Sequence, residues 1–279
     1  MTHDWRALTR QELDLAYDQR HHAANMQTIL ARLAQAGQEA HQRLPSRRLS
    51  YGASAIEMLD WYACGQAHAP LIFFIHGGAW KSGTARDYAF IVEWMLQAGW
   101  DVVIADFAAV TDADGDLQVL YRQLSQALNR VMQDTASHTQ PIHLCGHSSG
   151  AHLAACLATQ HPQQHLVRSL TACSGIYELE PVSLSSRSQY VKFTPESIQS
   201  LSPIRYAQSI QVPTRIVCGL KESPEFIRQA RAFHDALRQH SGLSALTLSD
   251  NLNHFEILET LATAQGTLAQ ELMASVSQA

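Results

Sequence analysis

A serine between two glycines stands near the middle of the chain, where its type and setting suit a nucleophile. The pentapeptide GHSSG (146–150) follows the apolar run 142–145 and precedes an alanine-rich stretch. A strand-to-helix turn of this kind strains the serine backbone, so the positions two before and two after must be very small, as both glycines are. The turn predicts that the Ser148 hydroxyl lies above the carboxyl end of a sheet. It also turns the first helix amides, that of Ser149 included, toward the same space.

A serine of this kind needs a base and an acid that orients the base, and in such folds they follow the serine in the order acid, then histidine. His254 stands in a predicted loop after the last apolar run and is the expected base. Glu222 follows the apolar run 214–220 and is favoured as the acid over Glu225, which stands at a helix start where the helix dipole explains a carboxylate. His147, beside the serine, points the wrong way along the turn and is the weaker candidate for the base.

A loop with two consecutive glycines follows another predicted strand, about 70 residues before the serine. The segment HGGAW (76–80) comes directly after the apolar run 71–75. Because Gly77 and Gly78 allow close approach of the main chain, their amides are expected to bind an oxyanion together with the amide of Ser149. One such donor is worth roughly 3 to 4 kcal/mol in the transition state. His76 is expected to brace this loop.

Aromatic residues near these motifs are predicted to wall a substrate pocket. The predicted pocket residues are Trp80, Tyr177 and Phe255. Packing in the core explains each of them about as well.

Short apolar runs alternate with amphipathic stretches along most of the chain. The apolar runs occupy 71–78, 101–108, 142–149, 169–176, 214–220 and, more weakly, 245–250. The helix-like stretches lie near 85–98, 117–134, 149–161, 224–240 and 255–275. Continuous apolar runs suit strands covered on both faces, and their alternation with helices predicts an α/β sandwich with a mostly parallel central sheet.

The chain is predicted to form one domain over residues 1–279, with two additions to the alternating pattern. Residues from about 1 to 45 are expected to form a helical amino-terminal extension, which begins with a capping box of Thr9 and Glu12. Residues from about 178 to 210 are expected to form an insertion or cap-like segment. We find no linker, repeat or low-complexity tract that would divide the chain.

Composition excludes several classes of protein. The 279 residues include 46% hydrophobic and 16% charged residues and carry a net charge of −5, with no basic cluster, which excludes a nucleic-acid binder. No apolar stretch reaches the length of a signal peptide or a membrane span, so we expect a soluble cytoplasmic protein. The five cysteines stand mostly in apolar runs and are expected to be buried thiols in a reducing compartment.

The chain holds 15 histidines, a number that raises the question of metal binding. It contains no HExxH motif and no CxxC pair, and neither 21–22 nor 161–165 places a carboxylate at a ligand spacing. No dinucleotide-binding or P-loop glycine pattern is present either. We therefore expect no metal and no cofactor.

Five sequence blocks together resemble a known family. In chain order they are HGGAW, GHSSGAHLA, SGIYELEP (174–181), ESPEF with the following RQ (222–229) and HFEILE (254–259). The chain resembles an α/β-hydrolase of the esterase/lipase group, and within it the serine-dependent kynurenine formamidase (arylformamidase) branch, over about residues 9 to 262. The last three blocks are the more specific ones, since the first two are shared by many esterases.

The resemblance implies a Ser-His-acid hydrolase without a cofactor. It assigns the nucleophile to Ser148, the base to His254 and the acid, usually Asp in the family, to Glu222, with the oxyanion loop at Gly77 and Gly78. It implies hydrolysis of a small acyl group, most directly the formyl group of an N-formyl aryl amide such as N-formylkynurenine. A carboxylesterase for short-chain esters is the alternative, and a catalytically silent fold that senses a ligand is a further one. The expected partner is a small-molecule acyl substrate, and a homodimer is left open.

Two departures from the family concern the substrate. Ala79 stands where the formamidases often carry a larger aromatic residue, and the segment 106–109 lacks the proline found there in the family. These changes are expected to reshape the acyl pocket.

Overall fold

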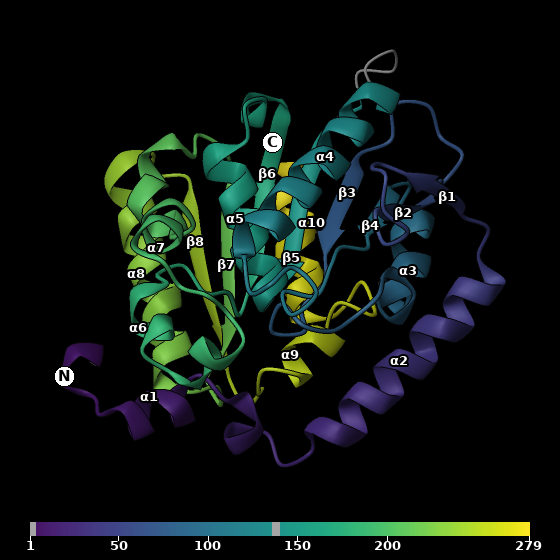
Figure 1. The fold of residues 1–279 in the computed structure, drawn as a ribbon. Coiled ribbons are helices and arrows are strands. Elements are labelled where there is room, and N and C mark those ends of the chain that lie inside the picture. Colours follow the sequence, from purple (N-terminus) through teal and green to yellow (C-terminus); the bar gives the residue numbers. More distant parts are fainter. Residues whose placement is uncertain (1–3, 136–139) are drawn as a thin grey trace.

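The fold is described from a computed structural model that covers residues 4–135 and 140–279, and its centre is one eight-stranded sheet (Figure 1). The strands are β1 (Arg47–Ser50), β2 (Met58–Tyr62), β3 (Leu71–Ile75), β4 (Asp101–Ala105), β5 (Ile142–His147), β6 (Val167–Cys173), β7 (Thr214–Gly219) and β8 (Ser244–Ser249). Their order across the sheet is β1-β2-β4-β3-β5-β6-β7-β8, and only the β1–β2 and β2–β4 pairs are antiparallel. The predicted α/β sandwich with a mostly parallel sheet is confirmed.

Helices cover both faces of the sheet. The α-helices are α1 (Arg10–Ala16), α2 (Met26–Arg43), α3 (Val92–Gln97), α4 (Leu117–Thr135), α5 (Ser149–Gln160), α6 (Glu180–Ser183), α7 (Pro195–Ser200), α8 (Pro224–His240), α9 (Glu256–Glu259) and α10 (Thr267–Ser277). The 3-10 helices are η1 (Trp5–Ala7), η2 (Gln19–His22), η3 (Ala85–Ile91), η4 (Gln164–Leu166), η5 (Ser186–Gln189) and η6 (Pro203–Ser209). No helix among the described residues is long and apolar enough to cross a membrane.

Two apolar cores lie on either side of the sheet. Helices α4, α5 and α8 pack on one face, whereas α3 and α10 pack on the other (Figure 1). Successive residues of a buried strand point into opposite cores, as Phe73 and Phe74 of β3 do. This two-sided burial explains why β3 to β7 are continuous apolar runs in the sequence.

The first two strands were not predicted, because they lack an apolar run. β1 is largely exposed at the edge of the sheet. β2 contains the buried Asp60, which forms an ion pair with Arg48 of β1 at 2.8 Å. Both strands therefore carry charged residues where a parallel core strand would carry aliphatic ones.

The amino-terminal extension, expected to be helical over about residues 1 to 45, contains four separate helical segments in the part that the structure describes. The predicted capping box is present, since Thr9 and Glu12 bond to each other's backbone amides. However, α1 ends at Ala16, η2 follows, and only then does α2 begin. In Figure 1 this purple segment runs along the edge of the molecule at which the carboxyl ends of the parallel strands lie.

Two other predicted helices are also interrupted. The stretch near 85–98 is η3 followed by α3, and the stretch near 255–275 is α9 and α10 with a loop between them. In that loop a Cβ atom on Gly266 would lie 1.8 Å from the carbonyl oxygen of Thr260, so the chain turns too tightly there to continue one helix.

Candidate active site

Ser148 occupies the sharp turn between β5 and α5. Its backbone has φ 55° and ψ −123°, a strained conformation for a residue with a side chain, and its amide donates to the carbonyl of Cys173 over 2.9 Å. A Cβ on Gly146 would lie 2.6 Å from the carbonyl oxygen of Gly150, and one on Gly150 would lie 2.1 Å from that of Ile75. Both glycines are therefore required by the packing of the turn, as the motif predicts.

His254 lies between Ser148 and Glu222 and is hydrogen-bonded to both. Its Nε2 is 2.9 Å from Ser148 Oγ, and its Nδ1 is 2.6 Å from Glu222 Oε2. The network assigns the Nδ1 proton to the bond with the carboxylate, so that Nε2 accepts from the serine hydroxyl. Glu225 is engaged elsewhere, since it accepts from the Tyr17 hydroxyl over 2.6 Å. Of the two acids weighed from the sequence, Glu222 is the one beside His254.

The Glu222 carboxylate is buried and well supplied with donors. Its Oε1 accepts from Ser174 Oγ at 2.5 Å, from the Gly219 amide at 2.8 Å and from the Cys218 thiol at 3.3 Å. Burial alone would raise the pKa of Glu222, but the charge of His254 and the hydrogen bonds from His254, Ser174 and Gly219 hold it below its ordinary value. The group therefore stays ionised and fixes the ring of His254.

His147 holds the loop of His254. Its Nε2 donates to the backbone carbonyl of His254 over 2.9 Å, and the two ring centroids are 4.8 Å apart. Burial and the neighbouring His254 lower the pKa of His147 to about 3, so the ring is neutral near pH 7. The sequence motif carries no signal for this contact, because its partner is a backbone carbonyl more than a hundred residues away.

The glycine loop after β3 approaches the serine with Gly78 and Ala79. Both line the cavity beside Ser148, and both have positive φ, 121° and 55°. A Cβ on Gly78 would lie 2.0 Å from the carbonyl oxygen of Ser82, so only glycine fits there. Gly77, predicted as an oxyanion donor, is absent from the described lining of the cavity.

Gly77 instead packs against the serine turn. A Cβ at this position would lie 3.0 Å from His147 Nδ1 and 3.3 Å from Ser148 Cβ, so the missing side chain lets the loop pack on the serine turn. His76 Nδ1 donates to the Gly77 carbonyl over 2.8 Å, and its ring stacks on Phe107 at 4.4 Å. His76 thus braces the loop, as expected.

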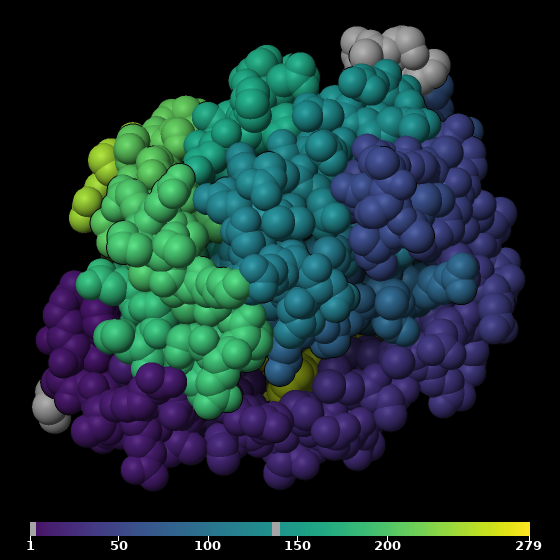
Figure 2. All heavy atoms as spheres, in the orientation of Figure 1, coloured from purple at the N-terminus to yellow at the C-terminus, as the bar shows by residue number. Residues whose placement is uncertain are grey.

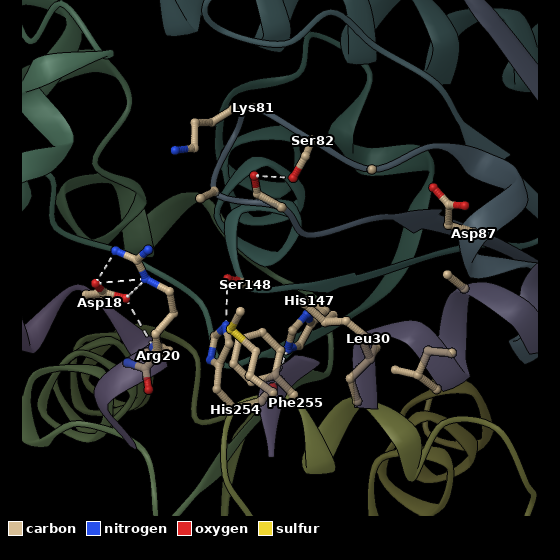
Figure 3. Close-up of a pocket in the computed structure, with 18 of the residues that line it drawn as sticks. Asp18, Arg20, Leu30, Lys81, Ser82, Asp87, His147, Ser148, His254 and Phe255 are labelled. Carbon is tan, nitrogen blue, oxygen red and sulfur yellow. Dashed lines mark hydrogen bonds and ion pairs between the residues drawn. The ribbon is translucent and has the colours of Figure 1, made fainter. Parts of the chain in front are cut away.

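A cavity of about 450 Å³ opens above Ser148 (Figure 3). Figure 2 shows a hollow in which yellow carboxyl-terminal atoms are visible between purple amino-terminal, green and blue segments. Its lining includes Phe90, Phe255 and Leu258 as apolar residues, and Asp18, Arg20, Lys81 and Arg187 as charged ones. In Figure 3, Asp18, Arg20 and Lys81 lie toward one side, whereas Leu30 and Phe255 lie toward the other.

The amino-terminal segment supplies much of this lining, a role that the sequence did not reveal. Residues of the segment from Tyr17 through α2 line the cavity. The segment is held by Gln19, which donates to Ser223 Oγ over 3.1 Å, and by Asn25, which donates to Glu256 over 2.7 Å. From the sequence this segment is predicted only as an amphipathic helical extension. Its contacts with the cavity could not be predicted, because these partners lie more than 200 residues away.

One of the three aromatic residues predicted for the pocket lines it. Phe255 does, but Trp80 and Tyr177 are absent from the described lining, and the prediction is wrong for these two. Trp80 is 1% exposed and its Nε1 donates to His152 over 3.2 Å. Tyr177 is fully buried and stacks on Phe233 with centroids 4.3 Å apart. Both belong to the core, which was the alternative explanation.

Within residues 4–135 and 140–279, no three His, Cys, Asp or Glu side chains are grouped so that they could hold a metal ion. The five cysteines are free thiols, and all except Cys64 are buried.

Comparisons with known proteins agree with this architecture. The sequence pattern of the BD-FAE family matches residues 59–178. A kynurenine formamidase from Danio rerio is 26% identical over 99% of both chains, and one from Salmo salar is 29% identical over 80% of this chain and 79% of the relative. The esterase LipC of Mycobacterium tuberculosis is 25% identical over 78% of this chain and 61% of the relative.

Solved structures share the fold. A putative thioesterase from a Silicibacter species superposes with a TM-score of 0.84 at 22% identity, covering 94% of this chain and 99% of that one. An esterase from Pyrobaculum calidifontis gives a TM-score of 0.73 at 14% identity, covering 97% of this chain and 98% of that one.

The fold and the sequence relatives together define the class: the chain has the α/β-hydrolase fold and is a hydrolase enzyme. Within this class it resembles kynurenine formamidase, and it shares nearly its whole length with one such relative.

Proposed function

We propose that the protein is a serine hydrolase that removes a small acyl group, most directly the formyl group of an N-formyl aryl amide such as N-formylkynurenine. The observation that carries the proposal is the continuous hydrogen-bonded chain from Ser148 through His254 to Glu222 at the cavity. The relatives named kynurenine formamidase support the substrate class.

The proposed reaction begins with attack of Ser148 Oγ on the formyl carbon. His254 Nε2, 2.9 Å from that oxygen, takes the hydroxyl proton as the bond forms. The imidazolium that results is stabilised by Glu222, whose carboxylate is 2.6 Å from Nδ1. The carbonyl oxygen becomes an oxyanion.

The oxyanion needs hydrogen-bond donors close to Ser148. The amide of Ser149, the first residue of α5, and that of Gly78 are the predicted donors that we retain. We replace Gly77 by Ala79, because Gly78 and Ala79 line the cavity beside Ser148, whereas Gly77 is absent from the described lining and packs on the serine turn.

Collapse of the oxyanion then breaks the carbon–nitrogen bond. His254 gives its proton to the departing nitrogen, so the aromatic amine leaves neutral and the formyl group stays on Ser148 as an ester. A water molecule enters, His254 removes its proton, and hydroxide attacks the formyl carbon. This intermediate collapses, His254 returns its proton to Ser148, and formic acid leaves and ionises to formate in water, which returns the enzyme to its starting state.

The cavity suits an aromatic leaving group. Tyr88, Phe90, Phe255 and Leu258 line it and offer apolar contact to a ring. A volume of about 450 Å³ accepts a single-ring amide.

A carboxylesterase for short-chain esters is the second candidate. The small Ala79 at the cavity wall and the esterases among the similar structures favour it. The same residues open esters and activated amides, so substrate preference separates the two activities.

The test is a comparison of kcat/KM for N-formylkynurenine with that for p-nitrophenyl acetate and butyrate. The formamidase proposal expects the formyl amide to be the better substrate by at least tenfold. Preference for the esters supports the carboxylesterase instead. If no substrate turns over and Ser148 is not labelled by an aryl phosphonate, the protein is a silent ligand-binding hydrolase fold and both enzymatic proposals fail.

A further inference from the structure

A buried arginine lines the same cavity without an acidic partner among the residues that the structure describes. Arg187 of η5 is 8% exposed. Its Nη2 donates to the Tyr17 carbonyl over 2.9 Å, its Nη1 lies 3.4 Å from the Tyr190 hydroxyl, and its Nε has no partner among the described residues. Two of its five N–H groups are thus in contact with neutral oxygens, and neither oxygen neutralises the charge.

Other arginines that point inward in this protein are compensated by carboxylates. Arg48 pairs with two aspartates, Arg228 pairs with two glutamates, and Arg215 pairs with Glu271 at 3.2 Å. Each of these three is more exposed than Arg187. Burying a guanidinium without a counterion is unfavourable, so the setting of Arg187 suits a site whose counterion arrives with a ligand.

Neighbouring groups reinforce the positive charge at this wall. Lys81, which follows the glycine loop, places its ammonium 4.4 Å from the ring centroid of Tyr190 and forms no ion pair with a described residue. The guanidinium of Arg187 lies 5.2 Å from the ring of Trp80, next to that loop. Two uncompensated cations thus flank Tyr190.

The acidic residues that line the cavity already have partners other than Arg187 and Lys81. Asp18 forms an ion pair with Arg20, and Asp87 accepts from the amide and hydroxyl of Thr84 at 3.1 and 2.8 Å. Figure 3 shows Asp87 on the side of the cavity away from Arg20 and Lys81. The wall formed by Arg187 and Lys81 therefore keeps a positive charge.

We propose that Arg187, assisted by Lys81, binds a carboxylate carried by the substrate, so that the enzyme selects aryl acyl compounds with an anionic side group. The planar fork of a guanidinium matches the two oxygens of a carboxylate. The inference rests on the proposed function only in that the substrate occupies this cavity, whichever acyl group is removed.

Equilibrium binding tests the proposal without turnover. The probes are benzoate, phenylacetate, 3-phenylpropanoate and 4-phenylbutanoate, each paired with its primary amide, titrated by calorimetry at pH 7.5 into the full-length Ser148→Ala protein. The series varies the distance between ring and charge. At least one acid is expected to bind tenfold or more tightly than its amide, as a charge-assisted hydrogen bond provides.

Substitutions then test whether Arg187 and Lys81 cause the preference for an acid over its amide. Arg187→Gln is expected to bring acid and amide within about threefold of each other, and Arg187→Lys is expected to keep part of the preference. Lys81→Gln, an exposed change that leaves folding intact, is expected to reduce the preference about two- to fivefold, since its charge is screened by solvent. Arg122→Gln, an exposed arginine outside the cavity lining, is the matched control and should keep the full preference.

Two results would overturn the proposal: no acid binds more tightly than its amide, or the preference survives both Arg187→Gln and Lys81→Gln. The circular dichroism spectrum and melting temperature of each variant show whether it is folded. If Arg187→Gln is not folded, the binding of acid and amide to Lys81→Gln tests the proposal instead. Failure of the proposed hydrolysis is recognised separately, by absence of turnover in the unmutated protein.

Discussion

His147 donates its Nε2 proton to the backbone carbonyl of His254 over 2.9 Å, so the residue before the proposed nucleophile holds the loop of the proposed base. The ring is buried and neutral, with a pKa of about 3, and it packs against Gly77 of the glycine loop. Three chain segments that must converge for acyl transfer are thus joined through one imidazole.

The first prediction concerns this contact. His147→Ala is expected to lower kcat about tenfold or more with a smaller change in KM, because the base loop loses a buried hydrogen bond worth about 1 to 3 kcal/mol. His147→Gln keeps a donor and should recover part of the loss. Steady-state kinetics with N-formylkynurenine measures both. An alanine variant with the parent kcat would show that the contact does not position His254.

A second prediction concerns the acid. Ser174→Ala removes the 2.5 Å bond to Glu222, which helps to hold the pKa of that carboxylate down. The pKa of Glu222 should rise, and the acid limb of the kcat profile should move to higher pH with a loss of about three- to tenfold in kcat. The profile is measured between about pH 4 and 9, a range that spans the ordinary pKa values of Glu and His. An unshifted alanine profile contradicts the assignment.

The glycine loop supplies a matched pair of substitutions. Gly78→Ala should reduce kcat at least a hundredfold, because the added carbon meets the Ser82 carbonyl oxygen and the position has φ 121°. Ala79→Gly leaves the amide in place and suits the positive φ of 55°, so activity should stay within about threefold. The ratio of the two kcat values is the readout. Equal activities would mean that the loop conformation is irrelevant to the reaction.

Stability should fall on mild acidification. Burial lowers the pKa values of His143 and His152 to about 4 and that of His147 to about 3. Between these values and the ordinary pKa near 6.5 the unfolded chain binds more protons, so the contribution of each ring is complete above about pH 6.5 and declines as pH falls toward 4 or 3.

The expected decrease in the free energy of unfolding from pH 7 to pH 5 is about 2 kcal/mol for each ring. Urea titrations at the two pH values measure it. His143→Gln should make the decrease from pH 7 to pH 5 smaller by about 2 kcal/mol, the contribution of one ring. A wild-type protein equally stable at pH 7 and pH 5 would show that these rings are not buried as neutral groups.

Local patterns were sufficient to predict the parallel sheet and the sharp turn at Ser148. The predicted strand runs that form β3 to β7 are largely buried on both faces, whereas β8 is half-buried. The glycines around the serine are required by contacts within the turn and with the end of β3. His254 and Glu222 were found by their places after strands, since parallel strands bring their carboxyl ends to one edge.

Contacts between distant segments explain what the sequence did not reveal. The lining supplied by Tyr17 depends on partners in the second half of the chain, and Trp80 turned inward because His152 accepts its indole proton. That no acid pairs with Arg187 among the described residues is likewise apparent only from the three-dimensional structure. No spacing rule connects such residues.

The most direct test of the account is the rate of N-formylkynurenine hydrolysis by Ser148→Ala compared with the unmutated protein. We expect kcat to fall by about 10⁴- to 10⁶-fold, because the nucleophile is removed while the oxyanion donors and the pocket remain. The circular dichroism spectrum and melting temperature should be unchanged. A folded alanine variant that hydrolyses the substrate at the parent rate would contradict the central claim.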